Sequence, residues 1–198
     1  MDPLWRAVFG NDRPVEIEIG PGRGDVLVAF ALERPAVNFF AIEHIHGAVE
    51  RLRARLDEVG ITNARVIAAD AAWVLRHVVP RASVVRYHIY FPDPWPKRRH
   101  HKRRIVTPSL AEALRRTLVP GGVVHAASDL PWLFDEISRT LTNGGFTRAP
   151  NVWQPERPTT HFERKYARAG TFAGTFAPAE PGAAAQLPAP SPSPQKNS

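Results

Sequence analysis

Three carboxylates and a short glycine loop stand where the chain could bind a nucleoside cofactor. An apolar run at residues 15–19 contains Glu18 and leads into a loop in which every second residue is glycine, namely Gly20, Gly22 and Gly24. Glycines at such a place let the backbone turn tightly and approach a ligand closely. Glu43 closes the next apolar run, where a carboxylate can accept hydrogen bonds from both ribose hydroxyls. Asp70 closes the third run, where it could accept from an adenine amino group.

The spacing of the glycines distinguishes between two kinds of cofactor. A dinucleotide site would want G-x-G-x-x-G, whereas residues 20–24 read G-x-G-x-G, with Glu18 two positions before the first glycine. A pyrophosphate would be repelled by that carboxylate, but a sulfonium cofactor with a free amino group would not. The competing interpretation is structural: the glycines form a plain tight turn, and an acid such as Asp70 caps the helix that follows it.

A second group of residues with chemical potential follows the fourth apolar run. Residues 91–104 read FPDPWPKRRHHKRR, in which three prolines restrict the backbone and hold Asp93 in place. Trp95 could stack on a purine, and Asp93 could accept hydrogen bonds from the amide or amino edge of that base. Six of the eight residues at 97–104 are Lys or Arg, so the run is either a phosphate-binding surface or an ordinary solvated face. Its position directly after Pro-Asp-Pro-Trp favours nucleic acid.

The elements that must position these residues alternate between strands and helices. The apolar runs predict strands, and stretches with apolar residues at helical spacing predict helices. The expected strands are 15–19, 38–42, 64–68, 84–91 and 123–127, and the expected helices are 26–32, 47–59, 71–79, 108–118 and 132–141. Such βαβ alternation is typical of a Rossmann-like α/β fold with a mostly parallel, doubly wound sheet. In such sheets ligands bind beyond the carboxyl ends of the strands, which is where the acids and glycines stand.

The composition fits one soluble domain with a basic surface that could bind a partner. The 198 residues carry 26 Lys and Arg against 19 Asp and Glu, a net charge of +7. This excess favours a polyanionic partner, although a genome that prefers Arg would also produce it. We expect one domain at residues 1–177. Residues 178–198 are dense in Pro, Ala and Ser and predict a disordered tail.

Several function classes are excluded or disfavoured by what the sequence lacks. There are no cysteines, so disulfides, thiolate metal sites and cysteine nucleophiles are excluded. The histidines at 44, 46, 100 and 101 have no zinc-type spacing with a third ligand, so we expect no metal site. No signal peptide and no membrane-spanning run are apparent, so we expect a cytoplasmic protein. We also expect a monomer, although the sequence leaves an oligomer open.

The stretch at residues 91–104 resembles the signature of the bacterial tRNA (guanine-N7-)-methyltransferases. The pattern E-x-G-x-G-x-G at residues 18–24 resembles motif I of class I methyltransferases, and the resemblance continues from about residue 15 to residue 170. It includes His125-Ala-Ala-Ser-Asp129 and the stretch from Arg157 to Glu163. The resemblance implies the class I fold, S-adenosylmethionine as cofactor, tRNA as partner, and methyl transfer to guanine N7 at position 46 of the tRNA variable loop.

The resemblance also assigns roles to particular residues. Asp93 matches the proposed catalytic acid, which also contacts the cofactor. The remaining cofactor-binding residues would be Glu18, Gly20, Gly22, Gly24, Glu43 and Asp70. The substrate contacts would be Lys97, Asp129, Thr160, His161, Phe162 and Glu163. Because guanine N7 carries an in-plane lone pair, attack needs no prior deprotonation, and Asp93 would orient the base more than act on a proton.

The chain departs from the family pattern at places that bear on the substrate. The segment before residue 15 is short where relatives carry a longer basic lead, His161 stands where Lys is common, and Ser128 stands where Thr is usual. One alternative is therefore a methyltransferase of the same scaffold that acts on another nucleobase or a purine-like small molecule. The other is an RNA-binding module with an inert pocket, against which the intact glycines and strand-end acids argue.

Overall fold

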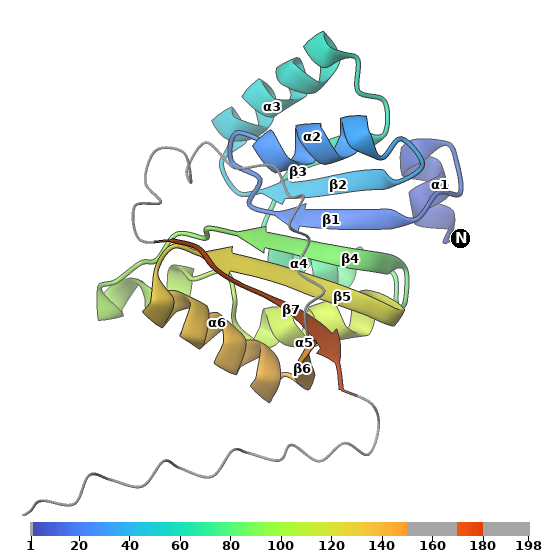
Figure 1. The fold of residues 1–198 in the computed structure, drawn as a ribbon. Helices are drawn as coiled ribbons and strands as arrows, with labels where there is room; N and C mark the ends of the chain where they lie inside the picture. Colours follow the sequence, from blue (N-terminus) through green and yellow to red (C-terminus); the bar gives the residue numbers. More distant parts are fainter. Residues whose placement is uncertain (1, 150–169, 180–198) are drawn as a thin grey trace, which may run out of the picture.

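The computed structural model describes residues 2–149 and 170–179, and its centre is a seven-stranded sheet (Figure 1). The strands lie in the order β3-β2-β1-β4-β5-β7-β6. Strands β1 to β5 pair in parallel, and β7 runs antiparallel to both β5 and β6. The bounds of the strands are β1 Val15–Ile19, β2 Asn38–Glu43, β3 Ala64–Ala68, β4 Val84–Tyr90, β5 Leu118–Ser128, β6 Phe146–Ala149 and β7 Phe172–Pro178. The predicted α/β class and the mostly parallel sheet are confirmed.

Helices cover both faces of this sheet. On one face α2 and α3 pack over β2 and β3, and on the other α1, α4, α5 and α6 share a core with the sheet. The bounds are α1 Pro3–Phe9, α2 Asp25–Glu33, α3 His46–Val59, α4 Ala71–His77, α5 Pro108–Thr117 and α6 Pro131–Asn143, with a 3-10 helix η1 at Arg98–Arg103. The buried apolar residues on the two faces form two separate clusters, one on each side of the sheet.

The N-terminal helix α1 was not expected from the sequence. Asp2 caps it by accepting a hydrogen bond from the Leu4 N–H at 2.9 Å, and the helix ends at Gly10. Trp5 is fully buried, and its indole N–H donates to Ser83 Oγ at 3.1 Å. The helix is short, so its stability comes from this tertiary packing and not from a long amphipathic pattern.

Strands β6 and β7 were also missed, because β6 has only four residues and Gly174 interrupts the apolar residues of β7. Phe176 of β7 is fully buried and pairs with Val124 of β5. Pro178, where the tail was expected to begin, is the last residue of β7 and pairs with Phe146. Residues 180–198 lie outside the described part of the chain.

Residues 120–122, Pro-Gly-Gly, were expected to form a turn before a strand beginning at 123. They lie inside β5, which begins at Leu118. The pairing of β4 with β5 changes register between Val84 and Arg86, so the three residues occupy an irregularity in the strand. The strands β1 to β5 nevertheless finish at the same edge, and this edge carries the residues singled out from the sequence.

Candidate active site

The glycine loop after β1 is shaped by backbone conformations that favour glycine. Gly22 has a φ of +55° and Gly24 a φ of +74°, both in the left-handed region. A Cβ at Gly24 would lie 2.2 Å from Leu52 Cδ1, so this glycine is also required by packing against α3. At Gly20 and Gly22 no protein atom lies within 4 Å of the place that a Cβ would take. The loop is therefore tightly held on one side and open on the other.

Glu43 fastens this loop to the end of β2. Its carboxylate is buried and accepts from the Gly22 N–H at 3.1 Å and from the Ile45 N–H at 2.9 Å. Each carboxylate oxygen has two lone pairs, so both oxygens can still accept a ribose hydroxyl. Glu18 is also buried, two residues before Gly20 on the neighbouring strand β1. Two buried acids thus lie at the ends of the strands next to the glycine loop.

Asp70 caps α4, as the competing structural interpretation held. Its Oδ1 accepts from the Trp73 N–H at 2.7 Å, and the residue is exposed. The end of β3 lies beside the end of β2, because the Ala69 N–H donates to the Glu43 carbonyl at 2.9 Å. Capping occupies one carboxylate oxygen, and binding of adenine by Asp70 remains a prediction.

The Pro-Asp-Pro-Trp loop leaves the end of β4, and Asp93 is exposed in it. Phe91 has a φ of +49° and Trp95 a φ of +40°, which are unusual for residues with side chains and occur mainly where the surroundings enforce them. The Phe91 N–H donates to the Ala127 carbonyl at 2.8 Å, so the loop begins against β5.

Trp95 is packed within the basic run that follows the loop. The guanidinium of Arg103 lies 4.9 Å from the centre of its ring, and the ring of His100 meets it edge-on at 5.7 Å. Arg103 thus lies over one face of Trp95, and stacking of a purine on this ring remains a prediction.

The expected substrate contacts are only partly within the described residues. Asp129 is half-buried directly after β5, beside the start of the Asp93 loop. Lys97 is exposed and precedes η1. Thr160, His161, Phe162 and Glu163 lie outside the described residues. Among the described residues, the structure brings Asp93, Asp129 and Lys97 to the same edge of the sheet as the glycine loop.

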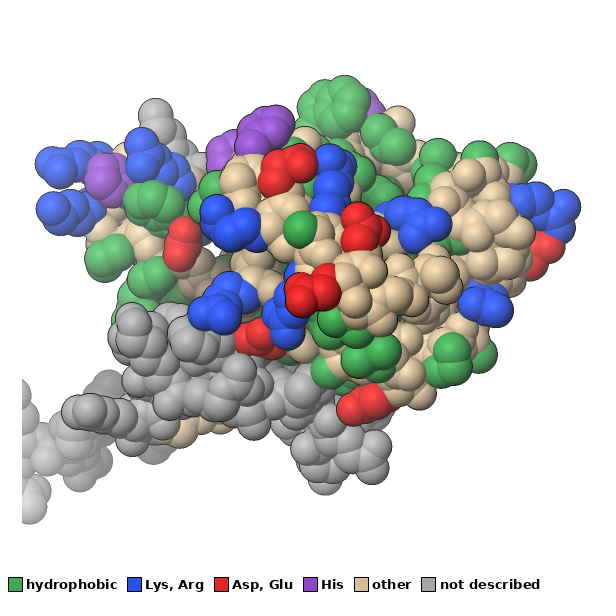
Figure 2. Space-filling model, turned by 90° about the horizontal axis from the view of Figure 1, so that it is seen from above, with side chains coloured by type: hydrophobic (Ala, Val, Ile, Leu, Met, Phe, Trp, Pro, Cys, Tyr) green, Lys and Arg blue, Asp and Glu red, His purple; other side chains and the backbone are tan. Residues whose placement is uncertain are grey.

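The basic run is not a uniform solvated face. In Figure 2, Lys and Arg side chains gather around histidines at the left end of the molecule, the end where the parallel strands of Figure 1 finish. Arg98 and Arg99 are exposed, as a phosphate-binding surface requires. The side chain of Arg104, however, is only 10% exposed and is bonded to protein groups. The expectation that the whole run faces solvent or a partner is wrong for Arg104.

A buried polar network joins strands β1 and β4 on one face of the sheet, and it was not predicted from the sequence. Glu16 on β1 accepts from Arg34 at 2.9 Å, from Arg86 at 2.8 Å and from His88 Nε2 at 2.8 Å. His88 Nδ1 lies 2.8 Å from the Tyr90 hydroxyl, and in the neutral tautomer that donates from Nε2 to Glu16 it accepts from that hydroxyl. The signal was present as polar residues at every second position of β1 and β4, a spacing that places them on one face.

The ionisation of this network follows from its burial. Burial by itself opposes ionisation of Glu16, but the hydrogen bond from His88 and the charges of Arg86 and Arg34 outweigh it, so the pKa of the carboxyl lies below its ordinary value. Burial lowers the pKa of His88, and it lowers the pKa of the neighbouring His125 to about 3. The network therefore holds one ionised carboxylate and two neutral imidazoles at neutral pH.

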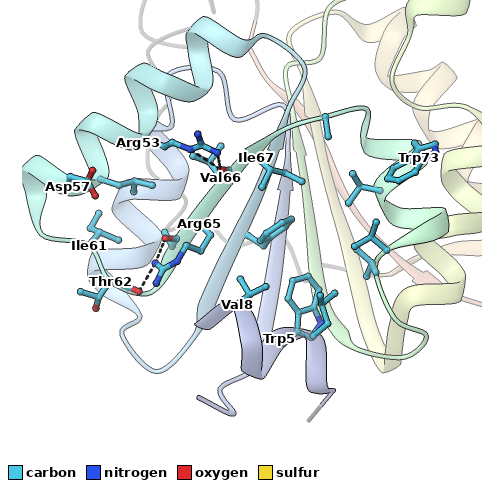
Figure 3. Close-up of a pocket in the computed structure, with 18 residues that line it drawn as sticks. Trp5, Val8, Arg53, Asp57, Ile61, Thr62, Arg65, Val66, Ile67 and Trp73 are labelled. Atoms are coloured by element: carbon cyan, nitrogen blue, oxygen red, sulfur yellow. Dashed lines mark hydrogen bonds between the residues drawn. The ribbon is translucent and has the colours of Figure 1, made fainter. Parts of the chain in front are cut away.

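An apolar groove of about 870 Å³ lies along the open edge of β3 between α1, α3 and α4 (Figure 3). Arg53 donates to the Val66 carbonyl at 3.1 Å, and Arg65 donates to the carbonyls of Thr62 and Ala64. These guanidiniums cover carbonyl groups of an edge strand that would otherwise be open to pairing. The lining of the groove includes Ala69 and Trp73, on either side of Asp70, but neither the glycine loop nor Glu43.

Across residues 2–149 and 170–179, no group of three or more His, Asp or Glu residues could hold a metal ion. In the same part of the chain, none of the helices has the length and apolar character needed to cross a bilayer.

The strand order, the antiparallel β7 and the glycine loop with its acids define the fold of a class I methyltransferase. Solved structures of methyltransferases are similar to this fold. The aminoglycoside resistance methyltransferase NpmB1 has a TM-score of 0.61 and 15% identity, over 87% of this chain and 90% of that one. An S-adenosylmethionine-dependent methyltransferase from Aquifex aeolicus has a TM-score of 0.60 and 13% identity, over 88% of each chain. At these identities the likeness concerns the fold alone.

Sequence relatives narrow the class further. Residues 12–173 match a family model described as "Putative methyltransferase". A tRNA (guanine-N(7)-)-methyltransferase of Vibrio parahaemolyticus is 41% identical over 173 residues, which are 84% of this chain and 72% of the relative. One of the same name from Aeromonas hydrophila is 40% identical over 170 residues, 83% of this chain and 72% of the relative. The chain belongs to the tRNA (guanine-N7-)-methyltransferase family.

Proposed function

We propose that this protein transfers a methyl group from S-adenosylmethionine to N7 of a guanine in tRNA, at position 46 of the variable loop. Relatives of that name match over 84% of the chain, and the matched region includes the glycine loop and the Pro-Asp-Pro-Trp loop. The observation that carries the proposal is the placement of Asp93 after β4, the strand that pairs with the strand leading into the glycine loop. A cofactor on the glycine loop and a base at Asp93 would then be neighbours.

The residues at the strand ends fit the cofactor. S-adenosylmethionine supplies, when bound, a methyl group on a positively charged sulfur that leaves as a neutral thioether. The open space over Gly20 and Gly22 accommodates a ligand against the backbone. Glu43 has the remaining lone pairs to accept two ribose hydroxyls, and Asp70 has a second oxygen to accept an adenine amino group. The carboxylate of Glu18 suits the amino group of the methionine part.

Asp93 and its loop supply orientation. The N1–H and amino edge of guanine donates hydrogen bonds, and a carboxylate is the acceptor that matches both donors. With that edge held, the lone pair of N7 would point in a fixed direction toward the methyl group. Alignment of this kind is worth several kcal/mol in well-oriented reactions. No proton has to leave the base before attack, so Asp93 acts as an acceptor and the reaction needs no strong base.

The tRNA would bind through its phosphates to the exposed part of the basic run. Arg98 and Arg99 are exposed in η1, which follows the Asp93 loop directly in the chain. Each neutralised phosphate releases condensed counterions, which makes such binding strongly dependent on salt.

We further propose that the protein acts as a monomer in the cytoplasm, and light scattering of the purified protein tests the oligomeric state.

The experiment is methyl transfer by the purified protein to a tRNA transcript that lacks modifications. The product should be N7-methylguanosine at position 46, located by chain cleavage at the modified base, and a transcript with adenosine at 46 is the control. Methylation at another base, or only of a free purine, would favour the alternative methyltransferase. Binding of S-adenosylmethionine and tRNA without any transfer would favour an RNA-binding module.

A further inference from the structure

Arg104 stands in a run of basic residues, but its side chain is directed into the protein. Its Nε donates to the Pro94 carbonyl at 3.1 Å, and its Nη2 donates to the Trp95 carbonyl at 3.3 Å. Its Nη1 donates to the carboxylate of Glu136 on α6. The planar guanidinium thus bonds to three acceptors at once, which a lysine ammonium on its flexible stem could not reproduce in the same geometry.

These bonds join the loop after β4 to the helix after β5. The side chain of Arg104 is 10% exposed and that of Glu136 is 33% exposed, so this ion pair is partly shielded from solvent. The guanidinium also lies 5.2 Å from the centre of the Trp132 ring in the first turn of α6. Figure 1 shows the short green segment of η1 beside the beginning of α6.

The joined segments are those that carry two expected substrate contacts. Asp93 lies in the loop that Arg104 holds by its carbonyls, and Asp93, Arg104 and Glu136 line one small pocket. Asp129 lies two residues before α6, in the turn where the Leu130 N–H donates to Ser128 Oγ at 3.1 Å. A displacement of α6 relative to the loop would therefore change the spacing between Asp93 and Asp129.

The loop needs such a restraint because of its backbone. Trp95 has a φ of +40°, a conformation that costs of the order of 1–3 kcal/mol for a residue with a side chain. It persists where the surroundings hold it, and the carbonyl of Trp95 itself accepts from Arg104.

We infer that Arg104, through its bonds to the loop carbonyls and to Glu136, is a positioning residue for methyl transfer that sets Asp93 relative to Asp129 and makes no phosphate contact. This inference rests on the proposed function, since Asp93 and Asp129 matter to catalysis only if they hold the base. The bonds to Pro94, Trp95 and Glu136 together form the Arg104 bridge.

The test compares Arg104→Met and Arg104→Lys with wild type. Both should lower kcat at saturating tRNA and cofactor by about 10- to 100-fold, the scale of a misplaced reactant. The Kd for tRNA should change by less than about twofold, and the slope of log Kd against log salt should stay that of wild type, because no phosphate contact is lost. Arg139→Met, at an exposed arginine of α6, is the matched control and should behave as wild type.

Amide hydrogen exchange gives a readout that does not depend on activity. The N–H groups of Asp93 and Trp95 should exchange faster in both Arg104 variants, whereas the strands β1 and β4 should exchange as in wild type. If the Met variant fails to fold, Glu136→Gln provides the second variant. It removes the charge of the partner and keeps the loop carbonyls, so it should raise loop exchange and lower kcat in the same direction by a smaller factor.

Two outcomes would overturn the inference. If Arg104→Lys restores wild-type kcat while Arg104→Met reduces the salt slope by about 1, the residue is a phosphate contact. If kcat is unchanged and only the melting temperature falls, the bridge serves stability alone. If the wild-type protein methylates no tRNA, the proposed function fails, and hydrogen exchange still decides whether the Arg104 bridge restrains the loop.

Discussion

The carboxylate of Glu43 accepts a hydrogen bond from the backbone N–H of Gly22 at 3.1 Å, so the end of β2 holds the middle of the glycine loop. Its second oxygen accepts from the Ile45 N–H. A residue expected only to bind ribose therefore also shapes the loop beside it. This double use of one carboxylate makes Glu43 the most informative position on the cofactor side of the site.

Replacing Glu43 by Gln should weaken binding of S-adenosylmethionine by about 1–3 kcal/mol, the range for loss of a charged acceptor. The amide offers one oxygen in place of two and brings a donor that faces either a backbone N–H or a ribose hydroxyl. Isothermal titration calorimetry measures the change. Glu58→Gln, at an exposed position of α3, is the control. Equal affinities for the Glu43→Gln variant and wild type would leave Glu43 with a structural role only.

The buried network predicts how stability depends on pH. Burial lowers the pKa of His125 to about 3, so below pH 6.5 the unfolded chain takes up a proton that the folded protein does not. Stability should therefore fall as the pH drops from 6.5 toward 3. The lowered pKa of His88 acts in the same direction, and that of Glu16 adds to the loss at lower pH.

Urea unfolding at pH 7.5, 6 and 5 measures this dependence for wild type and His125→Asn. In the middle of this pH window, uptake of one proton by the unfolded chain changes the free energy of unfolding by about 1.4 kcal/mol per pH unit. The slope of that free energy against pH should be smaller in the variant by up to this amount. His44→Asn, at an exposed histidine, is the control. Parallel pH profiles for wild type and the His125→Asn variant would show that His125 does not contribute.

The exposed arginines Arg98 and Arg99 should carry part of the tRNA binding. Reversing both to Glu should weaken tRNA binding and reduce the log–log salt slope by up to about 2, one for each lost phosphate contact. The affinity for S-adenosylmethionine should not change. The control is reversal of Arg81 and Arg115, exposed residues at the opposite ends of the strands. A salt slope equal to that of wild type would place the tRNA surface elsewhere.

The fold could be predicted from the sequence where local patterns dominate. Strands β1 and β3 have the predicted bounds, since each is an apolar run between turn signals. Helix α1 and strand β7 could not be predicted, because Trp5 and Phe176 are buried by distant segments and neither segment has a long periodic pattern. Pairing between remote segments is a property of the whole chain, and a local window does not contain it.

The candidate site could be predicted by residue type, but not by the use of each group. The glycine loop, Glu43, Asp70 and Asp93 stand at the strand ends, as the βαβ pattern implied. That Asp70 caps α4 with one oxygen depends on a side-chain rotamer that the sequence does not specify. Arg104 reads as one more charge in a basic run, and only its burial against α6 distinguishes it from Arg98 and Arg99.

The most direct measurement is the turnover of Asp93→Asn on unmodified tRNA, at saturating S-adenosylmethionine and with cofactor affinity titrated separately. Asn is nearly isosteric, but it presents a donor to the donor edge of guanine. Turnover should fall at least about a hundredfold, while tRNA binding, carried mostly by phosphates, should change little. Asp135→Asn, at an exposed position of α6, should match wild type. Formation of N7-methylguanosine at a near-normal rate by the Asp93→Asn variant would contradict the role of Asp93 in orienting the base.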